Sequence, residues 1–133
     1  VEEETNARDE KGNIASVYLN RYRKGMRLQA DPTVRYALRD FNIKQILFVH
    51  LDVESPYNTY RNKGLPPGPI CTPSLETLDA VLQSPETNYL YFVAKCDFSG
   101  KHDFSETFEE HLSKANDFRK ALLEQQRIRD ANR

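Results

Sequence analysis

The stretch EKGNIASVYLNRYRKGMRLQADPTV, residues 10 to 34, decides how the rest of the chain can fold. Its first half predicts a helix from Glu10 to Lys24, because apolar residues recur there at helical spacing: Ile14, Val17, Tyr18 and Tyr22. Gly25 follows a basic last turn, as a left-handed cap does. The second half predicts another helix, because Asp31 is a good N-cap and Pro32 suits a first helical turn. This helix is expected to end near Arg39.

Short apolar runs further along the chain predict strands. Residues 45–51, QILFVHL, are too few and too rich in β-forming residues for a helix, and 89–94, YLYFVA, has the same character. Ser99-Gly100-Lys101 is typical of a turn, and a return strand is expected over 102–104. Separate helices with one small hairpin predict an α+β fold with a small antiparallel sheet.

Prolines mark the middle of the chain as an ordered loop. Five of the seven prolines lie between Glu54 and Pro73, which excludes a regular helix or central strand there. Thr72-Pro73 then predicts a helix with one apolar face, made of Leu75, Leu78, Val81 and Leu82. A last helix from Ser105 is expected to bury Phe108, Leu112, Ala115 and Leu122. An exposed tail from Glu124 is expected to fray.

Composition indicates one soluble globular domain and argues against nucleic acid as a partner. The 133 residues include 38% hydrophobic and 29% charged side chains, and 19 basic residues are offset by 20 acidic ones. No apolar run approaches the roughly 20 residues that span a bilayer. The three histidines and two cysteines form no zinc motif, so no metal is expected. Cys71 and Cys96 are interpreted as two buried thiols, with a disulfide as the alternative.

The segment Tyr57-Asn58-Thr59-Tyr60 has the composition of a sugar-binding loop. It places two aromatic faces beside an amide and a hydroxyl, which suits a ring with apolar faces and a hydroxyl rim. The alternative for Asn58 is that its amide only satisfies backbone groups of the loop.

Several motifs together resemble the endolytic murein transglycosylase family, also called YceG-like. The matching runs, in the family's order, are VEEET (1–5), IASVYLNRYRKGMRLQADPTV (14–34), SPYNTY (55–60), GLPPGPI (64–70) and YLYFVA (89–94), with four positions of GKHDFS (100–105). They extend over nearly the whole chain. The resemblance therefore implies that residues 1–133 are a fragment of one YceG-like catalytic domain, with a membrane anchor and a LysM-like region upstream.

The resemblance also implies roles for individual residues. It makes Glu4 the catalytic acid and base, where residue pattern alone favours a solvated acidic helix end. It places a second group along the substrate cleft: Gln29, Asp31, Tyr57, Asn58, Thr59 and Tyr60. Asp31 serves equally well as a helix cap, Gly64–Ile70 is interpreted as a rigid wall, and His102 as a structural hydrogen-bonding residue.

The implied activity is cleavage of the bond between N-acetylmuramic acid and N-acetylglucosamine with formation of a 1,6-anhydro sugar, which trims or terminates nascent glycan strands. No cofactor is needed. The expected partners are peptidoglycan strands and cell-wall synthesis machinery. The expected location is the periplasm or the extracytoplasmic face of the inner membrane, with attachment through the upstream anchor. Alternatives are a non-catalytic peptidoglycan-binding module, a hydrolytic muramidase, and aminodeoxychorismate lyase, which needs pyridoxal phosphate and a much longer fold.

Overall fold

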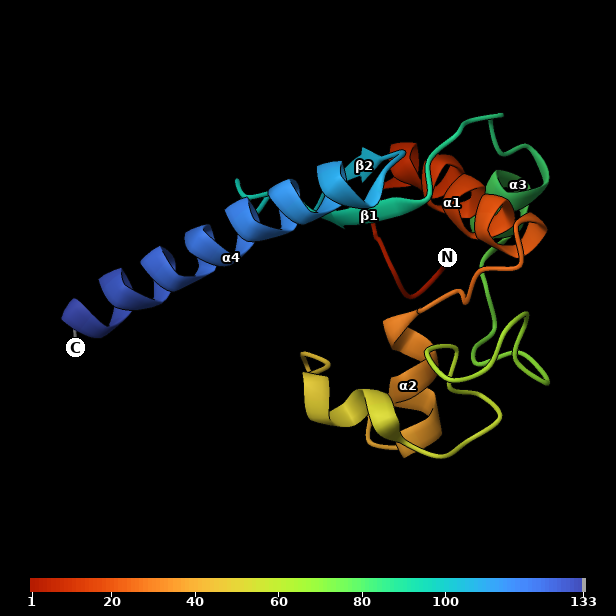
Figure 1. Cartoon of the computed structure of the whole chain (residues 1–133), viewed down its shortest axis with the longest axis horizontal. Coiled ribbons are helices and arrows are strands. Elements are labelled where there is room, and N and C mark those ends of the chain that lie inside the picture. Colours follow the sequence, from red (N-terminus) through yellow and green to blue (C-terminus); the bar gives the residue numbers. More distant parts are fainter. Residues whose placement is uncertain (133) are drawn as a thin grey trace.

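The structure is a computed structural model that describes residues 1–132, and Figure 1 shows the arrangement of its helices and its small sheet. In chain order the elements are η1 (Arg8–Glu10), α1 (Lys11–Arg23), α2 (Asp31–Leu38), η2 (Phe48–Asp52), α3 (Leu75–Leu82), β1 (Tyr91–Ala94), β2 (His102–Ser105) and α4 (Phe108–Ala131). The predicted α+β class is confirmed.

Helix α1 carries the core of the molecule. Ile14, Ala15 and Val17 are at most 1% exposed, and α1 contacts both α3 and β1. The predicted end of this helix is confirmed, because α1 stops at Arg23 and Gly25 has φ +71°. A side chain at that φ is strained, so glycine suits the turn that redirects the chain toward α2.

The predicted hairpin is confirmed as the antiparallel pair β1 and β2. Tyr91 pairs with Ser105, and Ala94 pairs with His102. Thr107 then caps α4 by accepting a hydrogen bond from the backbone N–H of Glu110 at 3.2 Å. Helix α4 runs along the hairpin in its first turns and extends well beyond it (Figure 1).

The strand predicted for residues 45–51 is wrong. The chain instead forms the 3-10 helix η2, in which Phe48 and Val49 are 87% and 74% exposed. The His50 ring Nδ1 accepts a hydrogen bond from the Leu47 backbone N–H at 2.9 Å, which closes the turn locally. Among the described residues, β1 and β2 are the strands of a two-stranded sheet, so the β-forming run has no strand beside it.

Two helices differ from the expected burial. Helix α3 begins two residues later than Thr72-Pro73 predicts, because the Ser74 hydroxyl is its cap and accepts from the Thr77 backbone N–H. Its expected apolar face is largely exposed at Leu75 and Leu82. In α4 no described residue is fully buried: Phe108 and Leu112 are 58% and 45% exposed, while Ala115 and Leu122 are half-buried. Beyond Glu124 the tail is exposed as predicted, but it is helical to Ala131.

The cysteines are both free thiols, but neither is fully buried, so the predicted burial is wrong. Cys71 is half-buried, whereas Cys96 lies exposed after β1. Within residues 1–132, no helix combines the length and the apolar character that crossing a bilayer requires.

Candidate functional site

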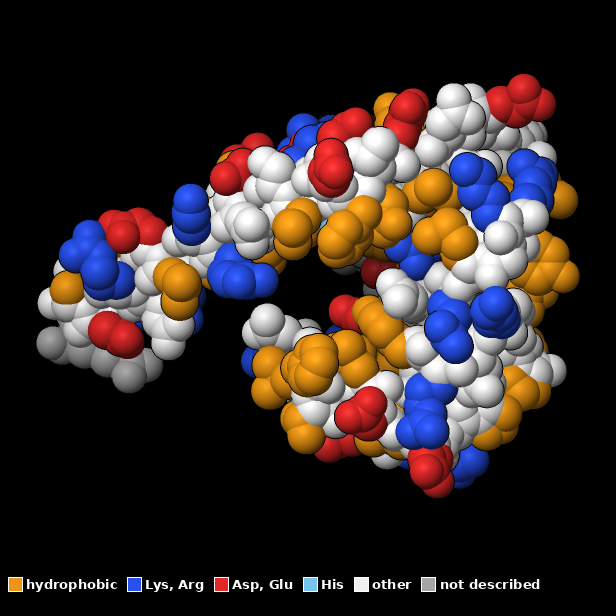
Figure 2. Space-filling model, viewed as in Figure 1, with side chains coloured by type: hydrophobic (Ala, Val, Ile, Leu, Met, Phe, Trp, Pro, Cys, Tyr) orange, Lys and Arg blue, Asp and Glu red, His pale blue; other side chains and the backbone are white. Residues whose placement is uncertain are grey.

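The hollow in Figure 2 separates the part of the molecule that carries α4 from the part that carries α2, and apolar side chains lie along its rims. A cavity of about 200 Å³ takes its lining from both parts. Its lining side chains come from the chain start, α1, the turn before α2, the start of α2, the proline-rich loop, β1 with the residue before it, and α4: Glu4, Val17, Tyr18, Arg21, Leu28, Gln29, Asp31, Tyr60, Leu90, Tyr91, Phe92, Phe108 and His111. Four of the seven residues predicted from sequence are in this set.

Glu4 is a half-buried carboxyl group in the wall of this cavity. Its Oε1 accepts a hydrogen bond of 2.5 Å from the Tyr18 hydroxyl. Burial raises the pKa of Glu4 above its usual value, the Tyr18 bond opposes that rise, and the charge of Asp31 adds to it. A carboxyl group with a raised pKa can be protonated before it meets substrate, as a general acid must be.

Asp31 and Tyr60 form a second polar pair in the cavity wall. Asp31 is the first residue of α2 and not its cap, which is Ala30, so the capping interpretation is wrong. Its carboxylate instead accepts a hydrogen bond from the Tyr60 hydroxyl. Gln29 precedes this pair in a left-handed conformation, φ +50°, and its side chain is exposed. Asp31, Tyr60 and Gln29 are therefore available to a ligand.

Tyr57, Asn58 and Thr59 do not line the cavity. Asn58 is completely buried, and its Nδ2 donates to the carbonyls of Leu51 and Val53 at 2.9 and 2.8 Å. Thr59 is 1% exposed and its hydroxyl accepts from the Ala30 backbone N–H at 2.8 Å. These two side chains therefore organise the loop that presents Tyr60, rather than offering groups to a ligand.

The Gly64–Ile70 loop does not form the predicted wall, because none of its residues lines the cavity. It lies behind Tyr57: a Cβ placed on Gly68 would be 3.3 Å from the Tyr57 hydroxyl. The Tyr57 ring packs in turn against Tyr36 of α2, with ring centroids 4.8 Å apart. The loop therefore supports α2, and its effect on the site is indirect, through the position of α2.

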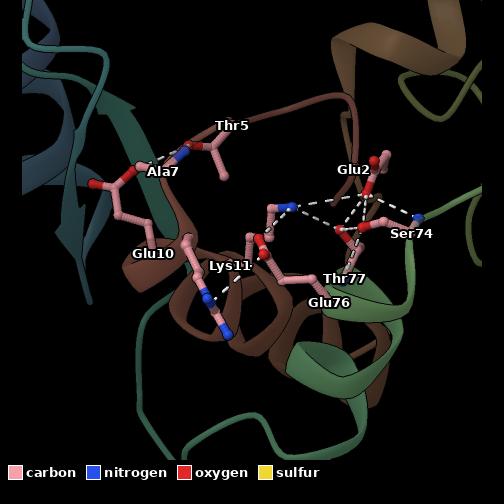
Figure 3. Close-up of polar contacts among 9 residues, drawn as sticks. Glu2, Thr5, Ala7, Glu10, Lys11, Ser74, Glu76 and Thr77 are labelled. Atoms are coloured by element: carbon pink, nitrogen blue, oxygen red, sulfur yellow. Dashed lines mark hydrogen bonds and ion pairs between the residues drawn. The ribbon is translucent and has the colours of Figure 1, made fainter.

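Two polar clusters hold the chain on either side of Glu4 (Figure 3). Upstream, the Glu2 carboxylate accepts hydrogen bonds from Ser74 and Thr77 at the start of α3. The ammonium group of Lys11, which is 7% exposed, donates to the Thr77 hydroxyl at 2.9 Å and pairs with Glu76 at 3.0 Å. A carboxylate is favoured at a helix N-terminus, so this cluster fixes Glu2 on α3.

The downstream cluster is centred on Glu10, which is 6% exposed. Its Oε1 accepts from the His102 backbone N–H at 2.5 Å, and its Oε2 lies 3.0 Å from His102 Nδ1. The Thr5 hydroxyl donates to the same carboxylate at 3.4 Å and accepts from the Ala7 backbone N–H at 3.0 Å. His102 is therefore a structural hydrogen-bonding residue, as its sequence context predicts. The cluster fixes the turn that follows Glu4.

Nine cavity residues were missed at the level of sequence, and four of them carry polar groups: Tyr18, Arg21, Tyr91 and His111. The helical spacing of Val17, Tyr18 and Arg21 could have found the first two, because it puts them on one face of α1. His111 could be found only from the packing of α4 on β1, where its ring stacks on Tyr91 with centroids 5.0 Å apart. Within residues 1–132, no three acidic, histidine or cysteine side chains are placed to hold a metal ion.

Residues 1–117 match the sequence profile of the YceG-like family. The chain belongs to this family. An endolytic murein transglycosylase of Bacillus subtilis strain 168 is 43% identical over 111 residues, which are 84% of this chain and 30% of that protein. The endolytic murein transglycosylase of Streptococcus pneumoniae serotype 2 strain D39 is 31% identical over 115 residues, or 84% of this chain and 21% of that protein.

A solved structure of a YceG-like protein from Listeria monocytogenes has the same fold over most of the chain. The two are 44% identical with a TM-score of 0.71, and the match covers 85% of this chain and 34% of that one. The YceG-like chain described here thus spans about a third or less of the length of these relatives.

Proposed function

We propose that this YceG-like chain carries the catalytic glutamate of an endolytic peptidoglycan lytic transglycosylase, and that this residue is Glu4. The observation that carries the proposal is a carboxyl group in a cavity wall, with its pKa raised by burial and with one oxygen held by Tyr18. The names of the Bacillus and Streptococcus relatives support the same class of reaction.

One carboxyl group suffices for this reaction, because the nucleophile belongs to the substrate. Glu4 gives its proton to the glycosidic oxygen of the departing N-acetylglucosamine, and the bond from that oxygen to C1 of the muramic acid breaks. The C6 hydroxyl of the same muramic acid then bonds to C1, and its proton passes to Glu4. The tethered hydroxyl replaces water, an advantage worth up to about 7 to 11 kcal/mol in a well-placed intramolecular reaction. A hydrolase would need a second group to activate water.

Tyr18 suits both halves of this cycle. When Glu4 loses its proton to the leaving group, the phenol already donates to the carboxylate that forms, without reorganisation. Asp31 and Tyr60, together with Gln29, are the proposed contacts to the sugars, since all three line the same cavity.

The test is mass analysis of muropeptides released from purified sacculi by the native protein and by Glu4→Gln. Native protein is expected to release products that end in anhydromuramic acid, lighter by one water than hydrolysis products. Glu4→Gln should retain glycan binding and release nothing, because an amide cannot transfer the proton. Anhydro products from Glu4→Gln at the native rate would exclude Glu4, hydrolysed products would indicate a muramidase, and binding without products from native protein would indicate a binding module.

The proposed substrate also sets the proposed location, the extracytoplasmic face of the membrane, where peptidoglycan is assembled. Fractionation of cells followed by detection of the protein checks this. Recovery in the cytoplasmic fraction would contradict the proposal.

A further inference from the structure

Arg21 is an almost buried cation in the same cavity as Glu4. It is 7% exposed and is the one Lys or Arg side chain among the cavity-lining residues. No carboxylate of residues 1–132 forms an ion pair with it. A buried charge without a counter-ion is costly, so a residue of this kind needs an explanation.

Part of the explanation is structural, but one nitrogen is left over. The Nε group donates to the Leu90 carbonyl at 2.6 Å, and Nη1 donates to the Arg27 carbonyl at 2.9 Å and to Gln29 Oε1 at 3.3 Å. None of the hydrogen bonds within residues 1–132 uses Nη2. A guanidinium group has five N–H donors, so Nη2 has two still to give.

The surroundings of Arg21 favour an acceptor oxygen over a second cation or an apolar group. The guanidinium carbon lies 4.9 Å from the centroid of the Tyr91 ring, which supports its plane. His111 stacks on the same ring, and burial together with the charge of Arg21 lowers the pKa of that imidazole. The lowered pKa favours the neutral imidazole, so Arg21 is the permanent positive charge among the residues that line the cavity.

We propose that Arg21, supported by Tyr91, is a substrate-specificity residue whose Nη2 binds a carbonyl or carboxylate oxygen on a substituent of the muramic acid ring. This rests on the proposed function of the site. Two substituents carry such an oxygen: the acetamido group at C2 and the lactyl group at C3. The lactyl oxygen belongs to an amide when a stem peptide is attached and to a carboxylate when the peptide has been removed.

The experiment measures binding in a Glu4→Gln protein, so that no strand is cut. Dissociation constants are compared for Arg21→Lys and for a matched control, Arg23→Lys, an exposed arginine of the same helix. The probes are peptide-bearing glycan strands, amidase-stripped strands and de-N-acetylated strands. Lysine keeps the charge but has one donor centre, so Arg21→Lys should bind peptide-bearing strands roughly tenfold more weakly while Arg23→Lys matches the parent.

The modified strands identify the source of the oxygen. If the oxygen belongs to the lactyl group, removal of the peptide should make strand affinity depend more strongly on Arg21, because a carboxylate replaces the amide. If it is the acetamido group, de-N-acetylation abolishes that dependence. Equal affinities of Arg21→Lys and Arg23→Lys for all three probes would overturn the proposal.

Arg21 also joins α1 to β1, so the thermal melt of Arg21→Lys must be measured first. If the variant unfolds, the Nε–H resonance of Arg21 in the Glu4→Gln protein gives the answer: it should shift on addition of strands, and an unmoved resonance overturns the proposal. The experiment separates failure of this inference from failure of the proposed function. If native protein releases anhydro products but glycan affinity does not depend on Arg21, only the role of Arg21 is refuted. If glycan affinity depends on Arg21 but native protein releases no products, only the proposed reaction is refuted.

Discussion

Replacing Tyr18 with Phe deletes a single hydroxyl from the site and keeps the ring that packs edge-on against Phe92 at 5.9 Å. The hydroxyl donates to Glu4, and in the proposed cycle it continues to donate when Glu4 changes from a neutral acid to a carboxylate. Only the increase in bond strength between those two states lowers the barrier. A neutral hydrogen bond contributes about 0.5 to 1.5 kcal/mol and one to a charged group about 1.5 to 3 kcal/mol. The difference of about 1 to 1.5 kcal/mol corresponds to a loss of roughly 5- to 12-fold in kcat/KM.

The same substitution should move the pH profile in a defined direction. The Tyr18 bond stabilises the carboxylate and so lowers the pKa of Glu4, in opposition to burial. Without it the pKa of Glu4 rises further, and the acid form persists to higher pH. The basic limb of the kcat/KM profile should therefore shift to higher pH.

The assay is the release of anhydro-muropeptides from sacculi across a pH series, with Tyr22→Phe as control. Tyr22 lies one turn further along α1 and is 53% exposed, so its variant should match native protein. A folded Tyr18→Phe protein with unchanged kcat/KM and an unmoved basic limb would refute the role given to Tyr18, and so would a shift of the limb to lower pH.

Further variants test other parts of the structure. Glu4→Gln should raise the melting temperature at pH 7, because burial raises the pKa of Glu4 and makes its ionised form destabilising. The gain in melting temperature should vanish as the pH falls through the raised pKa toward the pKa of Glu4 in the unfolded chain. A gain that persists at low pH would show that the charge of Glu4 is not its cause. Asn58→Ala should lower the free energy of unfolding by about 2 kcal/mol or more in urea titrations, since it leaves buried carbonyls unpaired; a stable but inactive variant would restore Asn58 as a ligand. Lys11→Met should cost about 1.5 to 3 kcal/mol by the same measurement, because it removes the charged donor to Thr77 and Glu76; no loss would mean that this cluster does not hold Glu2. Gly25→Ala should cost about 1 kcal/mol from backbone strain alone, as no atom lies within 4 Å of the added methyl group; a larger loss would indicate a contact there.

The features that sequence predicted correctly are those fixed by neighbouring residues. The spacing of Ile14 and Val17, the glycine after α1 and the turn between β1 and β2 each act within a few positions, and the structure has all three. Residues 45–51 failed because β-propensity needs a partner strand, and no local pattern shows whether one exists.

The site shows the same division. Glu4 and Asp31 lie in the cavity wall, where the motifs placed them, and their roles stay predictions. Asn58 looked like a sugar ligand because an amide beside two tyrosines has that character in any loop. Only the tertiary structure shows that its donors are used by the carbonyls of Leu51 and Val53. Arg21 and His111 were missed for a related reason: their significance comes from Tyr91, which lies 70 positions from one and 20 from the other in sequence.

The contact between Glu10 and His102 bears on when the protein becomes able to act. It joins residues 92 positions apart, so it is among the most costly contacts in chain entropy and cannot exist until the hairpin has been synthesised and has folded. Thr5 rests on that carboxylate, and Glu4 precedes Thr5. A nascent or partly unfolded chain therefore contains Glu4, the proposed acid, without the contacts that position it in the cavity. If the chain has the proposed glycan-cleaving function, its site becomes competent only once the fold is complete.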